Sequence, residues 1–356
     1  MFFSIEHRID NFKQFYARNN TKPLFGFFAE SEYPLFRYRS TCNLPTDRPL
    51  SPDDFVVDDL LGDYDRLFDL HEQAGGDFIF AASSFWGIPW LEAALGCEIF
   101  ADHSTGSIYA KHPESLSSVN LEYSSDNGWV KKGVEFLDKL AAHSNGRFPL
   151  ATPRLRGISD LLACIYGDEN LVFKFFEDAE HIKELCTKLT DYWISFAAQQ
   201  LEHIPDFHGG IGSFYYHNWA PAGTVWLQED ASSILSPDIY SEFILPCVEK
   251  QIAAFNGCIT HMHPTGFYPY KQLVDTDMLA LELHIDEGGP GAKELFGVHK
   301  EILAKKPLII WGAITEEDLD FMFDNLPPQG LAIALALNNQ QMENKENERL
   351  YRKYKQ

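Results

Sequence analysis

Short apolar segments alternate with helical segments along this chain, and this alternation is the feature that most constrains its fold. Over residues 4–19, for example, Ile5, Ile9, Phe12 and Phe15 share one side of a helix. Strands that alternate with helices predict a mostly parallel sheet. The segments predicted as strands are 22–28, 77–82, 97–100, 148–152, 209–213, 258–263, 278–285, 307–312 and 331–337.

About eight strand–helix units fit a (β/α)8 barrel better than an open doubly wound sheet. No G-x-G-x-x-G motif follows a predicted strand, so nothing in the sequence supports a dinucleotide-binding fold. We therefore expect an α/β protein, a TIM-type (β/α)8 barrel with a helical N-terminal extension, forming a single domain over residues 1–356. The N-terminal cap and first strand would occupy 1–75, the rest of the barrel 76–340 and a charged tail 341–356.

Charge and composition narrow the range of partners. The chain has 52 acidic and 29 basic residues, a net charge of -23, which repels phosphate backbones and anionic lipids. We expect neither nucleic acid nor a membrane as a partner. The N-terminus does not have the pattern of a secretory signal, and the apolar run 331–337 is too short to span a bilayer. Six scattered cysteines without a C-x-x-C pair predict no disulfide and a cytoplasmic location.

Polar and aromatic residues gather where the predicted strands end. In (β/α)8 barrels, active residues lie at the C-terminal ends of the strands. The agreement of several such clusters therefore predicts one functional site at that end of the barrel. The clusters are 29–33, 83–92, 153–156, 214–230, 261–263, 282–284 and 312–314.

Two histidines end the predicted strand 258–263. Residues two apart on a strand point to the same face, so His261 and His263 aim at one point. In the next strand Glu282 and His284 alternate with leucines, and a helical connection places the two strands side by side. Two imidazoles and the Glu282 carboxylate are suitable ligands for zinc or another divalent metal. The alternative is a pair of ordinary hydrogen-bonded histidines, with His284 as a further ligand, a supporting partner or a plain strand-end residue.

Several aromatic residues in the predicted loops are candidates for substrate binding. They could surround an uncharged or methylated ammonium substrate, with Glu30 and Glu32 at the rim of the pocket. The alternative is ordinary packing at the mouth of the barrel. These aromatic residues are Phe85, Trp86, Trp90, Tyr215, Tyr216, Trp219 and Trp226.

Four charged or titratable residues complete the candidate site. Arg154 and Arg156 are candidates to bind a substrate carboxylate bidentately, and the alternative is ion pairs with the many acids. His217 is a candidate general acid in a loop, where functional residues concentrate. Asp230 is a candidate general base, and the alternative is an acid that flanks a helix.

Three blocks of sequence resemble the uroporphyrinogen decarboxylase superfamily over roughly residues 20–340. This superfamily includes the metal-dependent methyltransferases that serve corrinoid proteins and cobalamin-independent methionine synthase. A weaker match is IPWLEAALG at 88–96. The blocks are PRLRG, DLLACIYG and FEDAEHI at 153–157, 160–167 and 176–182; QED, LSP and LP at 228–230, 235–237 and 245–246; and ITHMH with LE at 259–263 and 281–282.

The resemblance implies the methyltransferase branch rather than the decarboxylases. Decarboxylases carry an Arg-rich motif where this chain has Ala29, Glu30 and Glu32, and these carboxylates would repel a polyanionic tetrapyrrole. The methyltransferases bind zinc through H-x-C, a Glu on the next strand and a later Cys. His261 and Glu282 match that pattern, while His263 replaces the first Cys and no cysteine follows Cys258.

Three functions follow from these residues. We expect a metal-dependent methyl-transfer enzyme that acts on a small methylated substrate or a thiol, with zinc or another divalent metal at His261, His263 and Glu282. A corrinoid protein is the candidate partner, and the sequence leaves open whether the chain is a homodimer. The alternatives are a metal-free lyase or decarboxylase-like enzyme that uses His and Asp acid–base chemistry, and a non-catalytic corrinoid- or tetrapyrrole-binding module.

Overall fold

The computed structural model describes residues 4–214, 217–337 and 346–355. Within these residues the main sheet has six parallel strands, and two short antiparallel hairpins accompany it. The hairpins are β2 (Ile99–Asp102) with β3 (Ser107–Ala110), and β4 (Gly210–Ser213) with β5 (Asn218–Pro221). The strands of the main sheet, in spatial order, are β1 (Leu24–Ala29), β10 (Leu331–Leu337), β9 (Leu308–Gly312), β8 (Ala280–Ile285), β7 (Gly257–Met262) and β6 (Thr224–Gln228).

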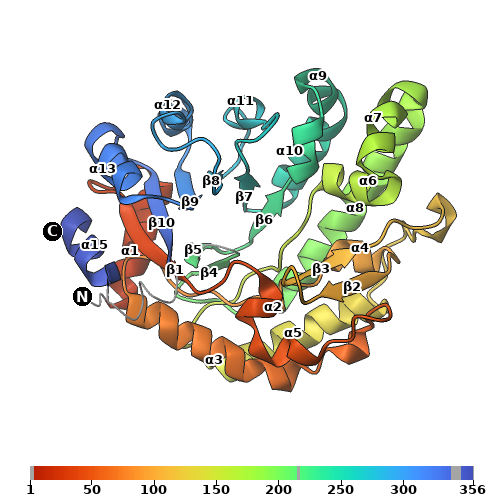
Figure 1. Cartoon of the computed structure of the whole chain (residues 1–356), viewed down its shortest axis with the longest axis horizontal. Helices are drawn as coiled ribbons and strands as arrows, with labels where there is room; N and C mark the ends of the chain where they lie inside the picture. The colour runs from red at the N-terminus through yellow and green to blue at the C-terminus, as the bar shows by residue number, and fades with distance from the viewer. Residues whose placement is uncertain (1–3, 215–216, 338–345, 356) are drawn as a thin grey trace.

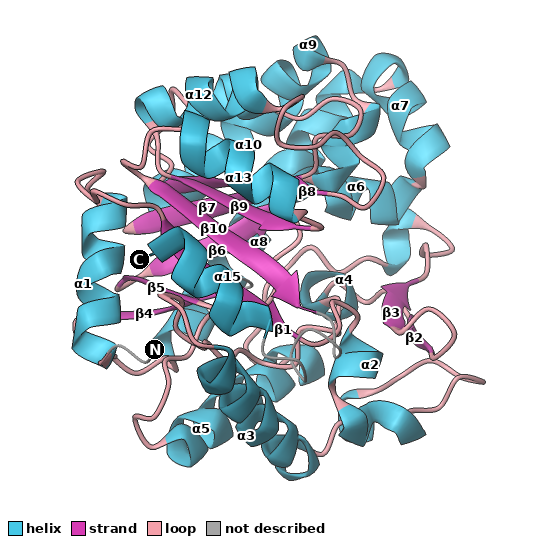
Figure 2. Cartoon of the chain, turned by 60° about the vertical axis from the view of Figure 1, so that its left-hand side comes forward, coloured by secondary structure: helices cyan, strands magenta, loops and turns pink. Residues whose placement is uncertain are grey.

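Helices lie outside the curved sheet. Figure 1 shows the six strands as an arc, with α10, α12 and α13 outside it and α3 and α5 on the opposite side of the molecule. Figure 2 shows strands β6 to β10 side by side between these two groups of helices. The helices are α1 (Ile5–Tyr16), α2 (Pro34–Arg37), α3 (Val57–Ala74), α4 (Trp90–Ala94), α5 (Gly128–Ser144), α6 (Ile158–Tyr166), α7 (Asp168–Glu177), α8 (Ala179–Glu202), α9 (Pro237–Ile239), α10 (Leu245–Ala254), α11 (Tyr270–Leu273), α12 (Phe296–Lys305), α13 (Glu316–Asn325) and α15 (Glu346–Lys355).

The strands of the main sheet are buried on both faces. The apolar runs LIIWG of β9 and LAIALAL of β10 are typical of a parallel sheet covered by helices. Parallel pairing also sets the register of the polar residues near the strand ends. Gln228 lies opposite His261, and His261 lies opposite Glu282. His284 lies opposite Trp311 on the next strand. The register of the parallel strands therefore places these residues next to one another without any contribution from the loops.

Two of the predicted strands are not regular strands in the structure. Segments 77–82 and 148–152 meet only through the parallel bridge of Ala82 with Leu150, and Arg156 forms a similar bridge with Gln228 of β6. The sequence therefore correctly predicts an α/β fold with a parallel sheet, and five of the six strands of the main sheet lie in predicted strand segments.

The hairpin β4–β5 explains why these two segments are irregular. The backbone N–H of Ile79 donates to the carbonyl of His217, at 2.7 Å. The N–H of Gly212 donates to the carbonyl of Leu150, at 2.8 Å. The hairpin lies inside the arc of the sheet (Figure 1) and takes backbone groups that a regular strand ladder would use. A single sequence cannot reveal this competition, because 209–213 reads as one more strand of the sheet.

Most of the other predicted helices and strands are present, but β6 lies in the segment 214–230, which the sequence did not predict as a strand, and the predicted strand 97–100 contributes to the hairpin β2–β3 instead of the main sheet. The predicted helix 236–255 is present as α9 and α10, separated by a π-helical turn at Tyr240–Ile244 that accommodates the helix-breaking Pro246. The tail forms α15, whose Tyr351 ring stacks on Phe25 of β1 at 6.3 Å. Among the described residues, every helix is too short or too polar to cross a bilayer.

Candidate metal centre

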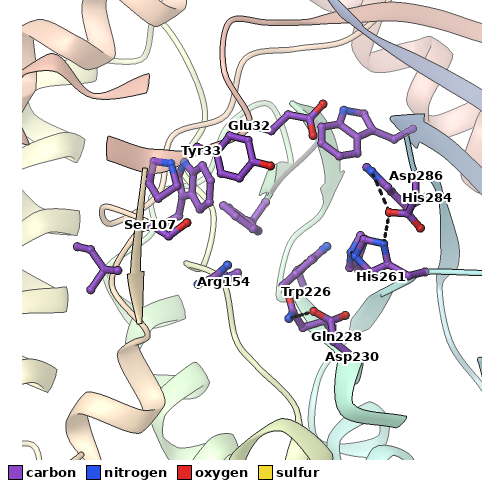
Figure 3. A pocket seen from close by; sticks show the side chains of 16 residues that line it. Glu32, Tyr33, Ser107, Arg154, Trp226, Gln228, Asp230, His261, His284 and Asp286 are labelled. Carbon is purple, nitrogen blue, oxygen red and sulfur yellow. Dashed lines mark hydrogen bonds and ion pairs between the residues drawn. The ribbon is translucent and has the colours of Figure 1, made fainter. Parts of the chain in front are cut away.

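A pocket of about 360 Å³ opens at the C-terminal ends of β6, β7, β8 and β9. Loops that follow β1 and the hairpin β2–β3 form its other walls. Figure 3 shows Arg154 and Tyr33 on one side of the pocket, across from the histidines and carboxylates. The lining residues are Glu32, Tyr33, Pro34, Trp86, Ser107, Ile108, Arg154, Phe214, Trp226, Gln228, Asp230, His261, His263, His284, Asp286 and Trp311.

The two histidines of the H-x-H motif face one another in this pocket. Their Nε2 atoms are 2.8 Å apart. The Nδ1 atom of His261 contacts the Glu282 carboxylate, and the Nδ1 atom of His263 lies 2.7 Å from the Asp286 carboxylate. Each carboxylate accepts a hydrogen bond from Nδ1, so each Nε2 lone pair is available to a metal. This is the arrangement in which histidines most often ligate metals.

Asp230 supplies a carboxylate close to the two histidines. Ligand atoms of Asp230, His261 and His263 all lie within 4.8 Å of one another. Gln228 donates from Nε2 to Oδ2 of Asp230, at 2.5 Å. The other oxygen, Oδ1, is buried and has no hydrogen-bond partner among the described residues. A buried carboxylate oxygen without a partner is costly, and a cation would satisfy it.

These donors fit a divalent metal with a small adjustment. Zinc binds imidazole nitrogen at about 2.0 to 2.1 Å, which places two tetrahedral nitrogen ligands about 3.3 Å apart. The observed Nε2–Nε2 distance of 2.8 Å is slightly shorter. Two imidazoles and one carboxylate, with space for a substrate or water, resemble the ligand sets of catalytic metals.

Glu282 therefore has a different position from the one predicted. The sequence indicates that it ligates the metal beside both histidines, and ligand atoms of His261, Glu282 and His284 do lie within 4.8 Å of one another. However, Glu282 contacts Nδ1 of His261, on the opposite side of the ring from His263. The ligand role predicted for Glu282 stays a prediction, and its contact with Nδ1 also suits it to orient the ring of His261.

Charges in the pocket set the protonation of its histidines. Burial lowers the pKa of His261, but the Glu282 carboxylate outweighs burial and raises that pKa to about 9. Burial, together with the charges of His261 and His263, lowers the pKa of His284 to about 2, so its imidazole is neutral. Burial raises the pKa of Asp286, but the hydrogen bond with His263 and the charges of the three neighbouring histidines together outweigh burial and lower it.

The structure brings eight of the candidate site residues to the pocket: Glu32, Trp86, Arg154, Trp226, Asp230, His261, His263 and His284. Arg154 is the only Lys or Arg among the lining residues that the structure describes, and its guanidinium lies 5.8 Å from the ring centroid of Trp86. Asp230, predicted as a general base, lies where a metal ligand is needed. The substrate-binding predictions for Trp86 and Arg154 remain predictions.

Four other predicted substrate-binding residues do not line the pocket. Glu30 forms an ion pair with Arg66 at 2.5 Å, and Trp90 is fully buried and donates to the Phe85 carbonyl. Arg156 is held by Glu92 at 2.9 Å. The remaining one, Trp219 of β5, is buried and donates to the carbonyl of Phe207. These residues have packing or ion-pair contacts in the structure, and Tyr215 and Tyr216 lie outside the described residues.

His217 is not positioned as the general acid that the sequence suggested. Its ring is stacked between Phe28 and Phe80, with centroids 5.3 and 4.8 Å away. Burial, together with the charges of His71 and Arg37, lowers its pKa well below the ordinary value. A neutral ring beneath the pocket, and not among its lining residues, serves to pack the hairpin against the sheet.

The sequence analysis missed two residues that matter for the site. Asp286 holds His263, and Gln228 holds Asp230. The signal for Asp286 was present, because residues 282, 284 and 286 continue the two-residue period of the strand beyond its predicted end. The sequence carried no such signal for Gln228, because β6, the strand that it ends, was not among the predicted strands.

Comparisons with known proteins do not identify a family for this chain. No protein-family model matches it, and no curated protein matches it. Among solved structures, one similar chain is a morphinone reductase mutant in complex with tetrahydroNAD. It is 11% identical, with a TM-score of 0.36, and the match covers 72% of this chain and 78% of that chain. A similarity this weak carries no argument about fold or activity.

Proposed function

We propose that this chain is a metal-dependent enzyme that transfers a methyl group between small molecules. The main support for a bound metal is the pair of facing Nε2 atoms, which are 2.8 Å apart. Each of the two rings is also hydrogen-bonded at Nδ1 to a carboxylate. Asp230 would complete the ligand set. The choice of methyl transfer depends on the sequence resemblance of His261 and Glu282 to the zinc motif of the corrinoid-linked methyltransferases, although in this proposal Glu282 orients His261 and does not ligate the metal.

The same proposal includes a complete (β/α)8 barrel. Segments 77–82 and 148–156 would occupy the places of the second and third barrel strands. Their bridges, Ala82 with Leu150 and Arg156 with Gln228, support this because both are parallel and the second one reaches β6. The pocket would then lie at the C-terminal mouth of the barrel, where the active sites of such enzymes lie.

Several residues of the pocket have a proposed role in this reaction. A bound divalent metal lowers the pKa of a coordinated thiol or water, so that the anion forms at neutral pH. Glu282 and Asp286 would orient the two imidazoles, and Gln228 would orient Asp230. Of the residues that the structure describes, no cysteine lines the pocket, so a reacting thiol would belong to the substrate. Arg154 would bind an anionic group of that substrate.

Metal content tests the first part of the proposal. We expect zinc in the wild-type protein purified without chelator, measured by elemental analysis, and its loss in His261→Ala. A matched control is His181→Ala on α8, outside the pocket, which should keep its metal. A wild-type protein that stays metal-free after zinc is added would sink the proposal.

Product analysis tests the second part. The zinc-loaded protein would be incubated with methylcobalamin and a panel of small thiols, and methyl thioethers would be measured by mass spectrometry. Turnover in wild type, but not in His263→Ala, supports methyl transfer to a thiol. If the metal-loaded protein forms no thioether with any thiol, the proposed metal site would be kept and the proposed methyl transfer would be rejected.

One observation favours a second candidate function, a metal-free acid–base lyase. The raised pKa of His261, about 9, makes it a cation that donates to His263 across the same 2.8 Å contact. A proton would then occupy the place of the metal. The zinc measurement separates the two candidates, because this function requires an active protein without metal.

A further inference from the structure

A single ion leaves donors in this pocket unused. The trio of Asp230, His261 and His263 takes the Nε2 atoms on one side of the histidine pair. A second trio of potential ligands, His263, His284 and Asp286, also has its ligand atoms within 4.8 Å of one another. Because His263 serves the first ion through Nε2, the donors that remain are His284 and Asp286.

His284 lacks the hydrogen bonds that a buried histidine normally makes. Only 7% of its surface is exposed, and its Nδ1 has no hydrogen-bond partner among the described residues. Its approaches to carboxylates are 3.8 Å long, from Nδ1 to Glu282 and from Nε2 to Asp286. Those distances are too long for hydrogen bonds. The distance from Nε2 to Asp286 matches the roughly 3 to 4 Å that separates two ligand atoms on one metal ion.

The neighbouring strand is shaped around the His284 ring. Trp311 of β9 packs on it with centroids 4.5 Å apart. Gly312 follows, with φ of +124°, and a Cβ atom there would lie 2.9 Å from Cε1 and 3.0 Å from Nε2 of His284. A glycine is therefore required for His284 to keep this position. A ring held so firmly is ready to bind, because little conformational freedom is lost on binding.

Carboxylates lie on the same side of the pocket. Asp286 accepts from His263 through Oδ1, while its Oδ2 is buried with no hydrogen-bond partner among the described residues. Glu32, from the loop after β1, lies nearby (Figure 3). The negative charges of Asp286 and Glu287 act on the carboxylate of Glu32. A cation here would relieve both the repulsion and the unpaired oxygen.

We propose that the pocket holds a second divalent cation, bound by His284, Asp286 and Glu32 beside the ion of the proposed function. This inference rests on that function, because it takes the first ion as present. Two carboxylates and one imidazole form a harder ligand set than that of the first ion, and such a set suits Mn²⁺ or Mg²⁺ better than the first set does. The second ion would bind an anionic group of the substrate, together with Arg154 across the pocket.

Stoichiometry tests the proposal directly. Chelator-stripped protein would be titrated with Zn²⁺ and then with Mn²⁺ in a calorimeter, and bound metal counted by elemental analysis after gel filtration. We expect two ions for each wild-type chain. His284→Ala should bind one, and Glu32→Gln, a change in a loop that does not threaten folding, should weaken Mn²⁺ binding by about tenfold or more. His181→Ala is the control and should bind two.

The outcomes separate this inference from the proposed function. One ion in the wild type, lost in His261→Ala, would keep the proposed function and overturn the second site. Two ions that persist in both His284→Ala and Glu32→Gln would also overturn it. No ion in the wild type would overturn both. Two ions, with one lost in His284→Ala while zinc is retained, would support it.

Discussion

His261 and His263 point their Nε2 atoms at one another across 2.8 Å, and each ring is anchored on its far side by a carboxylate. Residues two apart on a strand would ordinarily lie parallel, but these rings are nearly perpendicular, with an interplanar angle of 88°. The anchors, Glu282 and Asp286, come from β8 and the residue just after it. Two neighbouring strands therefore fix one small point in space, at which a metal or a proton would be held.

Removing the charge of Glu282 should weaken metal binding without abolishing it. In Glu282→Gln the amide oxygen can still accept from Nδ1 of His261, but the imidazole becomes less basic. We expect zinc affinity to fall by roughly 10- to 100-fold, measured by competition with a chromophoric chelator. Glu249→Gln, an exposed position on α10, should leave affinity unchanged. Complete loss of zinc would instead indicate that Glu282 is a direct ligand.

Removing Gln228 tests the position of Asp230. Gln228 is buried, and it fixes Oδ2 of Asp230 while leaving Oδ1 toward the histidines. Gln228→Ala should lower zinc affinity by about tenfold, because Asp230 would have to be ordered when the metal binds. Circular dichroism should remain that of the wild type. The matched control is Gln73→Ala, an exposed position on α3. An unchanged zinc affinity would argue against Asp230 as a ligand.

The part of the site that lies on strands could be predicted from sequence, because strand geometry is periodic. The spacing of His261 and His263, and their pairing with Glu282, follow from a two-residue period and parallel neighbours. What the sequence could not show was which ring nitrogen each carboxylate contacts. That depends on side-chain rotation, and it decides whether Glu282 ligates a metal or orients a ligand.

The part that lies in loops was harder to predict, for a physical reason. His217 and Trp219 belong to a hairpin that folds inside the arc of the sheet, so aromatic residues expected at the pocket lie beneath it. Glu30 and Arg156 form ion pairs with Arg66 and Glu92, which are distant from them in sequence. Local patterns indicate that such residues are polar or aromatic, but their partners are decided by tertiary packing.

The buried histidine pair beneath the pocket should make the protein sensitive to acid. His71 is 1% exposed, and its ring lies 5.0 Å from that of His217. Burial lowers the pKa of His71 from the ordinary 6.5 to about 4. Because the folded-state pKa is below the unfolded one, its contribution to stability is fully present above pH 6.5 and is lost as pH falls toward 4.

Because His71 becomes protonated between pH 6.5 and 4, we expect the free energy of unfolding to fall by about 3 kcal/mol over this pH range. Urea unfolding of wild type and His71→Phe at several pH values would measure it. The variant loses the titrating group, so its stability should fall less between pH 6.5 and 4, whatever its starting value. His181→Phe, at a partly exposed position, should follow the wild type. Equal slopes for wild type and His71→Phe would contradict the prediction.

Glycine at position 312 should be required both for stability and for the second cation. Its φ of +124° is strained for any other residue, and a Cβ atom there would clash with the carbonyl oxygen of Ile285. We expect Gly312→Ala to lower the free energy of unfolding by about 2 kcal/mol, measured by urea denaturation. Since the new methyl group would also displace His284, Mn²⁺ binding should weaken while zinc binding at His261 and His263 persists.

A matched glycine on a helix controls for the added methyl group. A methyl group added at Gly297 of α12 would meet no atom of the described residues within 4 Å, so Gly297→Ala should stabilise the protein by roughly 0.5 to 1 kcal/mol. The two substitutions are chemically identical and should have opposite effects on unfolding. If Gly312→Ala kept full stability and full Mn²⁺ affinity, the backbone at 312 could not be what holds His284, and the second cation site would lose its structural basis.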